Sequence, residues 1–214
     1  METQRRGLVN GMRSAAVGRS LPVTNACFLT LLVLPALQSG SKLSLVSLAD
    51  KDPGAICTDG TPSGYYWKAA TNPDGETLWV MYLQGGDWCY SPKSCSKRCR
   101  FSKSPLCSSS NWGPEWEHPG LFAPEHGAAL QSANKVFVRY CTSDAHVGDT
   151  DAFGFHFRGN RVVQAILTDL VVRRGLGQAP TTHGKKDLLV FGGGSAGARG
   201  AMMHLDYVPS MRGR

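Results

Sequence analysis

The chain has 214 residues, enough for about one ordinary domain, and 42% of them are hydrophobic and 18% charged. This composition excludes an intrinsically disordered chain, which would be poor in apolar residues and rich in charge. The formal charge is +7, but no basic stripe is interleaved with aromatic residues, so we do not expect a nucleic-acid partner.

The first forty residues are organised like a secretory signal peptide. A basic segment with four arginines precedes the apolar run from Ala26 to Leu37, and the small polar residues QSGS follow. The apolar run is shorter than the roughly 20 residues that span a bilayer, and no later segment is apolar enough to do so. We therefore predict a signal peptide over 1–40 and a secreted, extracellular or cell-wall protein, with a signal anchor as the alternative. Without these four arginines and Glu2, the formal charge falls from +7 to +4.

The seven cysteines fit an oxidising compartment. Cys27 would leave with the signal peptide, and an even number in a secreted chain predicts disulfide bonds, although the sequence alone does not fix their pairing. The alternative is a zinc site at the CSKRC stretch over 95–99, but no second pair of ligands follows at zinc-finger spacing. We expect no metal and no cofactor. The six remaining cysteines are Cys57, Cys89, Cys95, Cys99, Cys107 and Cys141.

The first half of the mature chain predicts strands. We expect a linker over 41–56. The segments GYYWKAA (64–70) and TLWVMYL (77–83) flank a turn-forming sequence, which predicts a hairpin whose second strand is buried on both faces. Residues 91–132 are loop-like, and KVFVRY (135–140) is a further strand.

The loop-like region contains a cluster of basic residues. Such a cluster either attracts an acidic polysaccharide or forms a solvated surface, and the sequence leaves both alternatives open. Its members are Lys93, Lys97, Arg98, Arg100 and Lys103.

The second half predicts a helix, a strand and a helix. Apolar residues from Val162 to Val171 recur on one helical face, and Gly175 offers a stop after two arginines. DLLVF (187–191) is a buried strand, and residues 196–208 form a helix that begins at the following turn. This alternation predicts an α/β fold, a parallel sheet with helices on both faces.

The turn between the last strand and helix has the pattern G-x-S-x-G, from Gly193 to Gly197. Glycines allow a sharp bend that exposes Ser195 at the sheet edge near the N–H groups of a helix N-terminus, as a nucleophile requires. The alternatives are a structural turn and a phosphate-binding loop. A phosphate-binding loop would require a lysine after the glycines, and this sequence has none there. Gly85 and Gly86 in YLQGGDWC follow an earlier strand, where such enzymes place an oxyanion-stabilising loop.

Five ordered motifs between Cys57 and Tyr207 resemble the pectin acetylesterase/Notum family of secreted serine carboxylesterases. They are CTDGTPSGYYWK, YLQGGDWCYSPKSC, VFVRYCTSD, FHFRG and GGSAGARGAMMHLD. The resemblance implies an α/β-hydrolase domain over 57–214 that hydrolyses an O-acyl ester of a substrate such as an acylated polysaccharide. The HFRG motif resembles the plant-type members, which implies that the acyl group is acetyl. Members of the Notum type instead remove a palmitoleoyl group from a signalling protein.

The resemblance also assigns residues. Ser195 would be the nucleophile, with the backbone N–H groups of Gly86, Asp87 and Ala196 as oxyanion donors. Disulfides would join Cys57 to Cys141 and Cys89 to Cys95, leaving Cys99 and Cys107 as a further local pair. Three positions depart from the family pattern: Gln84 replaces Glu, Asp87 replaces Trp or Gly, and Ala198 replaces Gly. A carboxylate at position 87 would oppose the developing oxyanion unless its side chain points away.

The resemblance places the acid and the histidine after the serine, so we expect both beyond Arg214, in a C-terminally truncated member whose sheet is incomplete after the nucleophile turn. His204 lies nine residues after Ser195, about 13 Å along the helix and on its opposite side, so we expect His204 and Asp206 on the helix surface. His146 as a substitute base would be outside the family pattern, and His156 is expected to make a structural hydrogen bond. His118, His126 and His183 have weaker cases as the base.

Two further expectations concern the whole chain. The strand 187–191 would lack a partner along one edge, and an exposed apolar edge promotes aggregation. The alternative to an esterase is a catalytically inactive, disulfide-stapled ectodomain that binds a glycan or a protein partner.

Overall fold

The computed structural model describes residues 42–72, 77–100, 104–117, 122, 128–177 and 186–210. All of them lie in one of the two compact units into which the chain divides, Leu37–Arg214. The predicted signal peptide over 1–40 lies outside the described residues. Within them, no helix is both long enough and apolar enough to cross a membrane.

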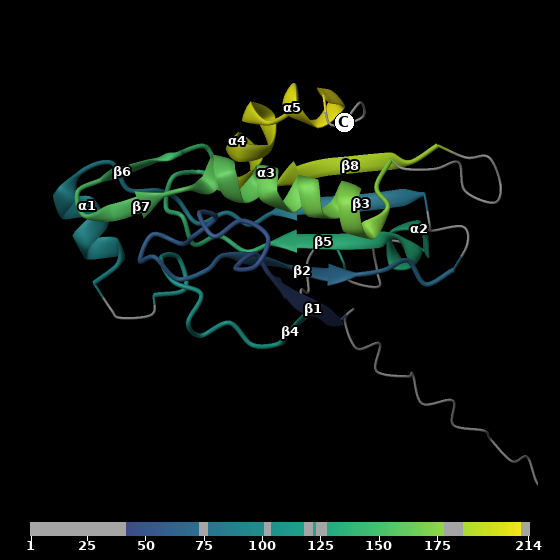
Figure 1. Ribbon diagram of the computed structural model, residues 1–214, viewed down its shortest axis with the longest axis horizontal. Helices are drawn as coiled ribbons and strands as arrows, with labels where there is room; N and C mark the ends of the chain where they lie inside the picture. Colours follow the sequence, from purple (N-terminus) through teal and green to yellow (C-terminus); the bar gives the residue numbers. More distant parts are fainter. Residues whose placement is uncertain are drawn as a thin grey trace, which may run out of the picture. The chain divides into compact units, whose positions relative to one another are not determined.

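A mixed six-stranded sheet forms the framework, in the order β4-β1-β2-β5-β3-β8 (Figure 1). Its strands are β1 (Lys42–Ser47), β2 (Gly64–Lys68), β3 (Leu78–Leu83), β4 (Glu115–Glu117), β5 (Asn134–Val138) and β8 (Leu188–Gly193). A separate hairpin joins β6 (Thr150–Ala152) to β7 (Phe155–Phe157). The α/β class is confirmed, but only β5, β3 and β8 are parallel, whereas the other pairs are antiparallel.

The predicted hairpin of 64–70 and 77–83 is wrong. β5 lies between β2 and β3, with Phe137 opposite Tyr66 on one side and Tyr82 on the other. A turn-forming sequence after β2 fixes the direction of the next strand but not its neighbour, so β5 takes the central position. The predicted burial of β3 is confirmed, because Met81 packs in the core on one face and Val80 in the core on the other.

The predicted linker over 41–56 is also wrong as a boundary. β1 pairs with β2 from Ser44 opposite Trp67 to Ser47 opposite Gly64, and the side chains of Leu43 and Leu48 are fully buried. The segment looked polar because its buried residues alternate with lysines and serines, as in a strand with one solvated face.

The helices are α1 (Pro92–Arg98), α2 (Ala128–Ser132), α3 (Gly159–Asp169), α4 (Ala196–Met203) and α5 (Tyr207–Ser210). α3 continues into the π-helical turn Leu170–Arg174 and stops at Gly175, whose φ of 90° is left-handed, as the sequence predicts. The predicted loop over 91–132 thus contains two short helices. α1 is capped by the Ser91 and Ser94 side chains, which exchange hydrogen bonds with each other's backbone N–H groups.

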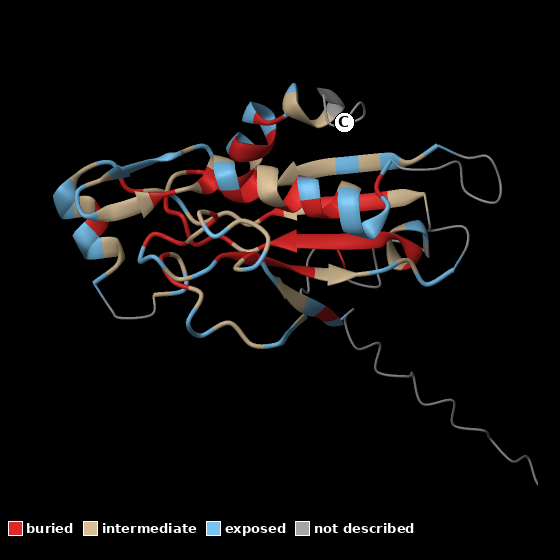
Figure 2. Cartoon of the chain, viewed as in Figure 1, coloured by how far each residue is buried: buried red, intermediate tan, exposed pale blue. Residues whose placement is uncertain are grey.

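The core has a layer on each face of the sheet. α3 crosses one face and buries Val163 and Ile166 against it, as the π-helical turn does with Leu170, and β5 is buried along its whole length (Figures 1 and 2). On the other face, Phe122 and α2's Leu130 pack against Phe137. In the described residues, this second layer is thus mostly irregular chain with one short helix.

The carboxyl ends of the parallel strands point to one side of the sheet. α4 begins on this side, where α1 and the β6–β7 hairpin also lie (Figure 1). Ligand sites of open α/β sheets form at such ends, so the sheet brings the segments after β3 and β8 together.

Candidate active site

Ser195 occupies the turn between β8 and α4 in a strained backbone conformation. Its φ of 50° and ψ of −115° are unusual for a residue with a side chain, and it is exposed. Glycines are required on both sides of it, since a Cβ on Gly193 or Gly197 would lie 2.6 or 2.0 Å from the Leu83 carbonyl oxygen. A strained, exposed serine between a strand and a helix is typical of a nucleophile elbow.

The segment after β3 lies against this serine. Residues 84–88 form what we call the 84–88 loop. A Cβ on Gly85 would come within 3.1 Å of the Ser195 Cβ and 2.4 Å of the Gly194 oxygen. The Gly194 N–H also donates to the Leu83 carbonyl over 3.2 Å. The fold therefore brings together the two segments that the sequence singles out.

Several backbone N–H groups at this junction are available as donors. Within the described residues, no acceptor contacts the N–H groups of Gly85, Gly86, Asp87 or Ala196. Unpaired N–H groups at a helix N-terminus and in an adjacent loop are the donors that an oxyanion requires.

The side chain of Asp87, whose carboxylate would oppose an oxyanion if it pointed toward it, is held locally. Its carboxylate oxygen accepts the N–H of Trp88 at 2.9 Å, and its φ of 61° is one that Asp tolerates better than most residues. The carboxylate is exposed, so water screens its charge.

The side chain of His146 is hydrogen-bonded to the backbone of the 84–88 loop. Its Nε2–H donates to the Gln84 carbonyl over 2.9 Å, and its ring packs against that of Tyr140, with the centroids 4.5 Å apart and the planes tilted by 30°. Only 1% of His146 is exposed, and burial, with the neighbouring His204, lowers its pKa to about 4. The ring is therefore neutral at neutral pH and bound to a carbonyl, and no hydrogen bond in the described structure joins it to Ser195.

The prediction that His204 lies on the helix surface is wrong. His204 is 4% exposed, and its Nε2–H donates to the His146 carbonyl over 2.8 Å. α4 approaches this closely because Gly200 faces Ala145 and His146, where a Cβ would lie 2.6 and 2.7 Å from their atoms. Asp206 is exposed, as expected.

The remaining histidines do not complete a catalytic triad in the described residues. His156 Nδ1 pairs with the Asp151 carboxylate at 2.7 Å on the β6–β7 hairpin, the structural role expected of it. His118, His126 and His183 lie outside the described residues. Within the described part of the chain, no histidine or carboxylate makes a hydrogen bond with Ser195 Oγ.

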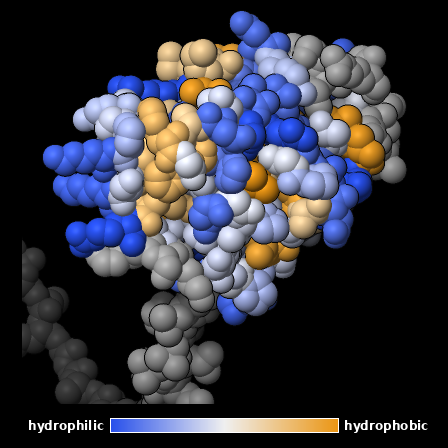
Figure 3. Space-filling view, turned by 60° about the vertical axis from the view of Figure 1, so that its left-hand side comes forward, coloured by the Kyte–Doolittle hydropathy of each residue, from blue (hydrophilic) through white to orange (hydrophobic). Residues whose placement is uncertain are grey.

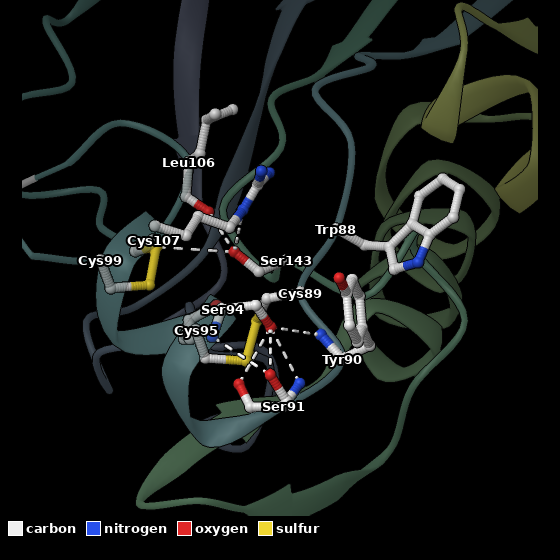
Figure 4. The surroundings of a disulfide bond; sticks show 12 residues. Trp88, Cys89, Tyr90, Ser91, Ser94, Cys95, Cys99, Leu106, Cys107 and Ser143 are labelled. Carbon is white, nitrogen blue, oxygen red and sulfur yellow. Dashed lines mark hydrogen bonds between the residues drawn. A yellow bond between two sulfur atoms is a disulfide. The ribbon is translucent and has the colours of Figure 1, made fainter.

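Three disulfides brace the segments around the site. They join Cys57 to Cys141, Cys89 to Cys95 and Cys99 to Cys107, the pairs that the resemblance implies. In the last two, Cys95 lies within α1 and Cys99 directly after it, so these bridges hold the helix close to the residues after the 84–88 loop (Figure 4). In the described residues, no cluster of potential ligands could hold a metal ion.

One member of the basic cluster, Arg98, lies beside the site. Lys93, Lys97 and Arg100 of the basic cluster are exposed, and Lys103 lies outside the described residues. Arg98 is instead half-buried and donates hydrogen bonds to the backbone of Gly86 and Asp87. No pattern in the sequence distinguishes it, because neighbouring positions carry the same charge.

A groove of about 500 Å³ opens next to the 84–88 loop. Trp88 and Arg199 form one part of it, with the guanidinium 4.4 Å from the ring centroid, and the rest is lined by Val147, Met202, Met203 and their neighbours. Hydrophobic side chains gather in separate patches on the surface, divided by hydrophilic ones (Figure 3).

The parallel strands, the elbow after β8 and the loop after β3 define a chain of the α/β-hydrolase-like class. The crystal structure of the Wnt deacylase Notum from Drosophila has this fold. It matches with a TM-score of 0.69 at 27% identity, over 80% of this chain and 48% of that one.

The chain belongs to the pectinacetylesterase family, whose sequence profile matches residues 36–212. It is 33% identical to the palmitoleoyl-protein carboxylesterase notum1' of Xenopus laevis, over 79% of this chain and 33% of that protein. It is 32% identical to pectin acetylesterase 5 of Arabidopsis thaliana, over 78% of this chain and 38% of that protein. The chain thus spans about a third of the length of these relatives.

Proposed function

We propose that this chain supplies the nucleophile and the oxyanion hole of a secreted serine carboxylesterase. The observation that carries the proposal is the exposed Ser195 at φ 50°, set against a loop whose N–H groups have no acceptor among the described residues. Membership of a family named for an ester hydrolase supports the same chemistry.

In the proposed reaction, Ser195 Oγ attacks the carbonyl carbon of an O-acyl ester. The carbonyl oxygen becomes negative and accepts hydrogen bonds from the N–H groups of Gly86, Asp87 and Ala196. The alcohol leaves with a proton, and water then releases the carboxylic acid from the acyl-serine. A general base must take the Ser195 proton. This base would be a group outside the described residues.

We propose an O-acetylated polysaccharide as the substrate. The similarity to a pectin acetylesterase supports this class, although the identity to a palmitoleoyl-protein carboxylesterase is nearly equal. The groove between Trp88 and α4 is the surface on which part of the substrate would lie. Three disulfides favour an oxidising, extracellular location.

The nucleophile can be tested without its natural base. The purified chain is incubated with p-nitrophenyl acetate and with imidazole as a soluble base, and its peptides are analysed by mass spectrometry. We expect one acetyl group on the peptide that contains Ser195 and none at this site in Ser195→Ala. Acetylation spread over many serines and lysines, without preference for Ser195, would contradict the proposal.

A second candidate is an inactive ectodomain that binds a glycan or a protein. The described residues favour it in one respect, since they hold no base at Ser195. The same assay without imidazole separates the two. Continuous turnover that is lost in Ser195→Ala indicates a complete esterase, whereas acetylation only with imidazole indicates that this chain alone is silent.

A further inference from the structure

Arg98 reaches from the end of α1 to the backbone of the 84–88 loop. Its Nη2 donates to the carbonyl oxygen of Gly86 and, at 3.3 Å, to that of Asp87. Its Nε donates to Ser143 Oγ over 2.9 Å, and its guanidinium lies 5.7 Å from the centre of the Tyr140 ring. One side chain thus binds two consecutive peptide groups of this loop.

These contacts fix the direction of an N–H group. In a trans peptide, the carbonyl oxygen of one residue and the N–H of the next point in opposite directions, and the chain has no cis peptide among the described residues. Arg98 holds the Gly86 oxygen on its own side, so the Asp87 N–H faces away from Arg98. His146 holds the Gln84 oxygen in the same way, which orients the Gly85 N–H.

The backbone here would not hold this orientation by itself. Gly86 and Asp87 have φ of 148° and 61°, both in the left-handed half of conformational space, and glycine permits many alternatives. A 180° rotation of the 86–87 peptide would exchange its carbonyl and N–H. It would place a carbonyl oxygen where the oxyanion forms.

The charge of Arg98 contributes as well. A cationic donor on a carbonyl polarises the peptide group, and polarised groups bind more strongly through their other end, by an estimated 10–30% per bond. The positive charge of Arg98 also offsets the negative charge of the exposed Asp87 carboxylate.

Arg98 is itself held firmly. Ser143 Oγ, which accepts its Nε–H, donates to the Leu106 carbonyl over 2.8 Å. Along the chain, Arg98 lies between Cys95 and Cys99, which are bridged to Cys89 and Cys107 (Figure 4). The backbone at Arg98 is therefore constrained by a disulfide on each side, and hydrogen bonds hold the guanidinium.

We infer that Arg98 is a positioning residue that fixes the 86–87 peptide with its N–H toward the reacting oxygen. This inference rests on the proposed function of Ser195. Arg98 acts through the peptide group and does not itself contact the substrate.

The test compares Arg98→Ala with Lys97→Ala, a neighbouring exposed residue of α1 with the same loss of charge. The first readout is the backbone order parameter of the Gly86 and Asp87 N–H vectors by NMR relaxation, which does not depend on activity. The second is the rate of Ser195 acetylation by p-nitrophenyl acetate with imidazole. Circular dichroism establishes that both variants are folded, and Arg98→Lys replaces Arg98→Ala if the latter unfolds.

We expect Arg98→Ala to slow Ser195 acetylation about 100-fold, the loss seen when one oxyanion donor is removed. Added methylguanidinium should restore part of the rate, whereas Lys97→Ala should behave as the wild type. Arg98→Lys should lie between the two, because an ammonium holds one carbonyl but not two in fixed geometry.

The outcomes separate the inference from the proposed function. Unchanged order parameters and unchanged acetylation in the folded Arg98→Ala variant would overturn the positioning role. If the wild type shows no selective acetylation of Ser195, the proposed function fails. The order parameter of the Asp87 N–H then still decides whether Arg98 orders this peptide.

Discussion

His146 shows how a buried histidine can serve a site without doing its chemistry. Its Nε2–H donates to the Gln84 carbonyl, and its own carbonyl accepts from His204. A protonated imidazolium would make the same hydrogen bond but would bring a charge into the interior, close to a second histidine. Burial therefore keeps the ring neutral.

This neutrality predicts a pH dependence of folding. The pKa of His146 falls from an ordinary 6.5 to about 4 in the folded chain, so the unfolded chain binds the proton more readily between these values. Stability is then complete above pH 6.5 and is lost as the pH falls toward 4, by about 3 kcal/mol for this group.

Urea unfolding at pH 7 and pH 4 measures the effect. His146→Gln keeps a donor for Gln84 but does not titrate, so it should lose about 3 kcal/mol less than the wild type over this range. The lowered pKa of His204 and the raised pKa of Asp144, both caused first by burial, are present in both proteins and cancel in the comparison. Equal losses would show that His146 does not titrate between these limits.

At this scale, the sequence predicts Ser195 and its glycines, because the turn is local and every part of it lies within five residues. It does not predict Arg98 or His146 as neighbours of the loop, since the contacts of His146 cross 62 residues. Nor does it show that His204 is buried, because helical geometry gives the side of α4 but not what covers it.

Among the elements, α4 depends on a close approach to the segment that carries His146. Gly200 lies where a Cβ would meet the Ala145 oxygen at 2.6 Å and the His146 Cβ at 2.7 Å. Neither atom can move away without moving backbone, so the fit of α4 requires glycine inside a helix, where alanine is otherwise preferred by about 1 kcal/mol.

We expect Gly200→Ala to lower the free energy of unfolding by about 1–3 kcal/mol, the usual effect of overpacking. Gly192→Ala is the matched control, because a Cβ at that position meets nothing within 4 Å. Chemical denaturation of both variants gives the comparison. A Gly200→Ala variant as stable as the control would mean that α4 shifts without loss.

The elements themselves were predictable where their signals are local. The stripe from Val162 to Val171 and the stop at Gly175 correspond to α3 and the turn after it. The predicted hairpin is wrong because the pairing of strands depends on the whole sheet. β5 pairs with both β2 and β3, although it lies more than fifty residues after them in the sequence. The prediction of a loop missed α1, which has only seven residues.

For the whole molecule, the described sheet ends at β8, as the sequence predicts. Leu188 and Val190 are 62% and 44% exposed along this strand. An apolar edge with free backbone groups is a template for a further strand.

We therefore predict concentration-dependent self-association of this chain, measured by sedimentation velocity. Val190→Lys should suppress it, because a charge on an edge strand prevents pairing. Val172 belongs to the π-helical turn and not to β8, and it is 63% exposed. Val172→Lys should therefore leave the self-association unchanged. A wild type that remains monomeric at all concentrations, or equal suppression by both variants, would contradict an association through β8.

The bridge between Cys57 and Cys141 closes residues 57–141 into a covalent ring. The residues after Cys141 form a tail outside this ring. The ring's 84-residue span contains both other bridges, and closing a ring of this size removes about 4–5 kcal/mol of chain entropy from the unfolded state. The 84–88 loop lies inside the ring, whereas Ser195 lies on the tail, which is joined to the ring only by the main chain after Cys141 and by non-covalent contacts. No disulfide therefore ties the two segments of the candidate site to each other, and the pairing of β3 with β8 holds them in register.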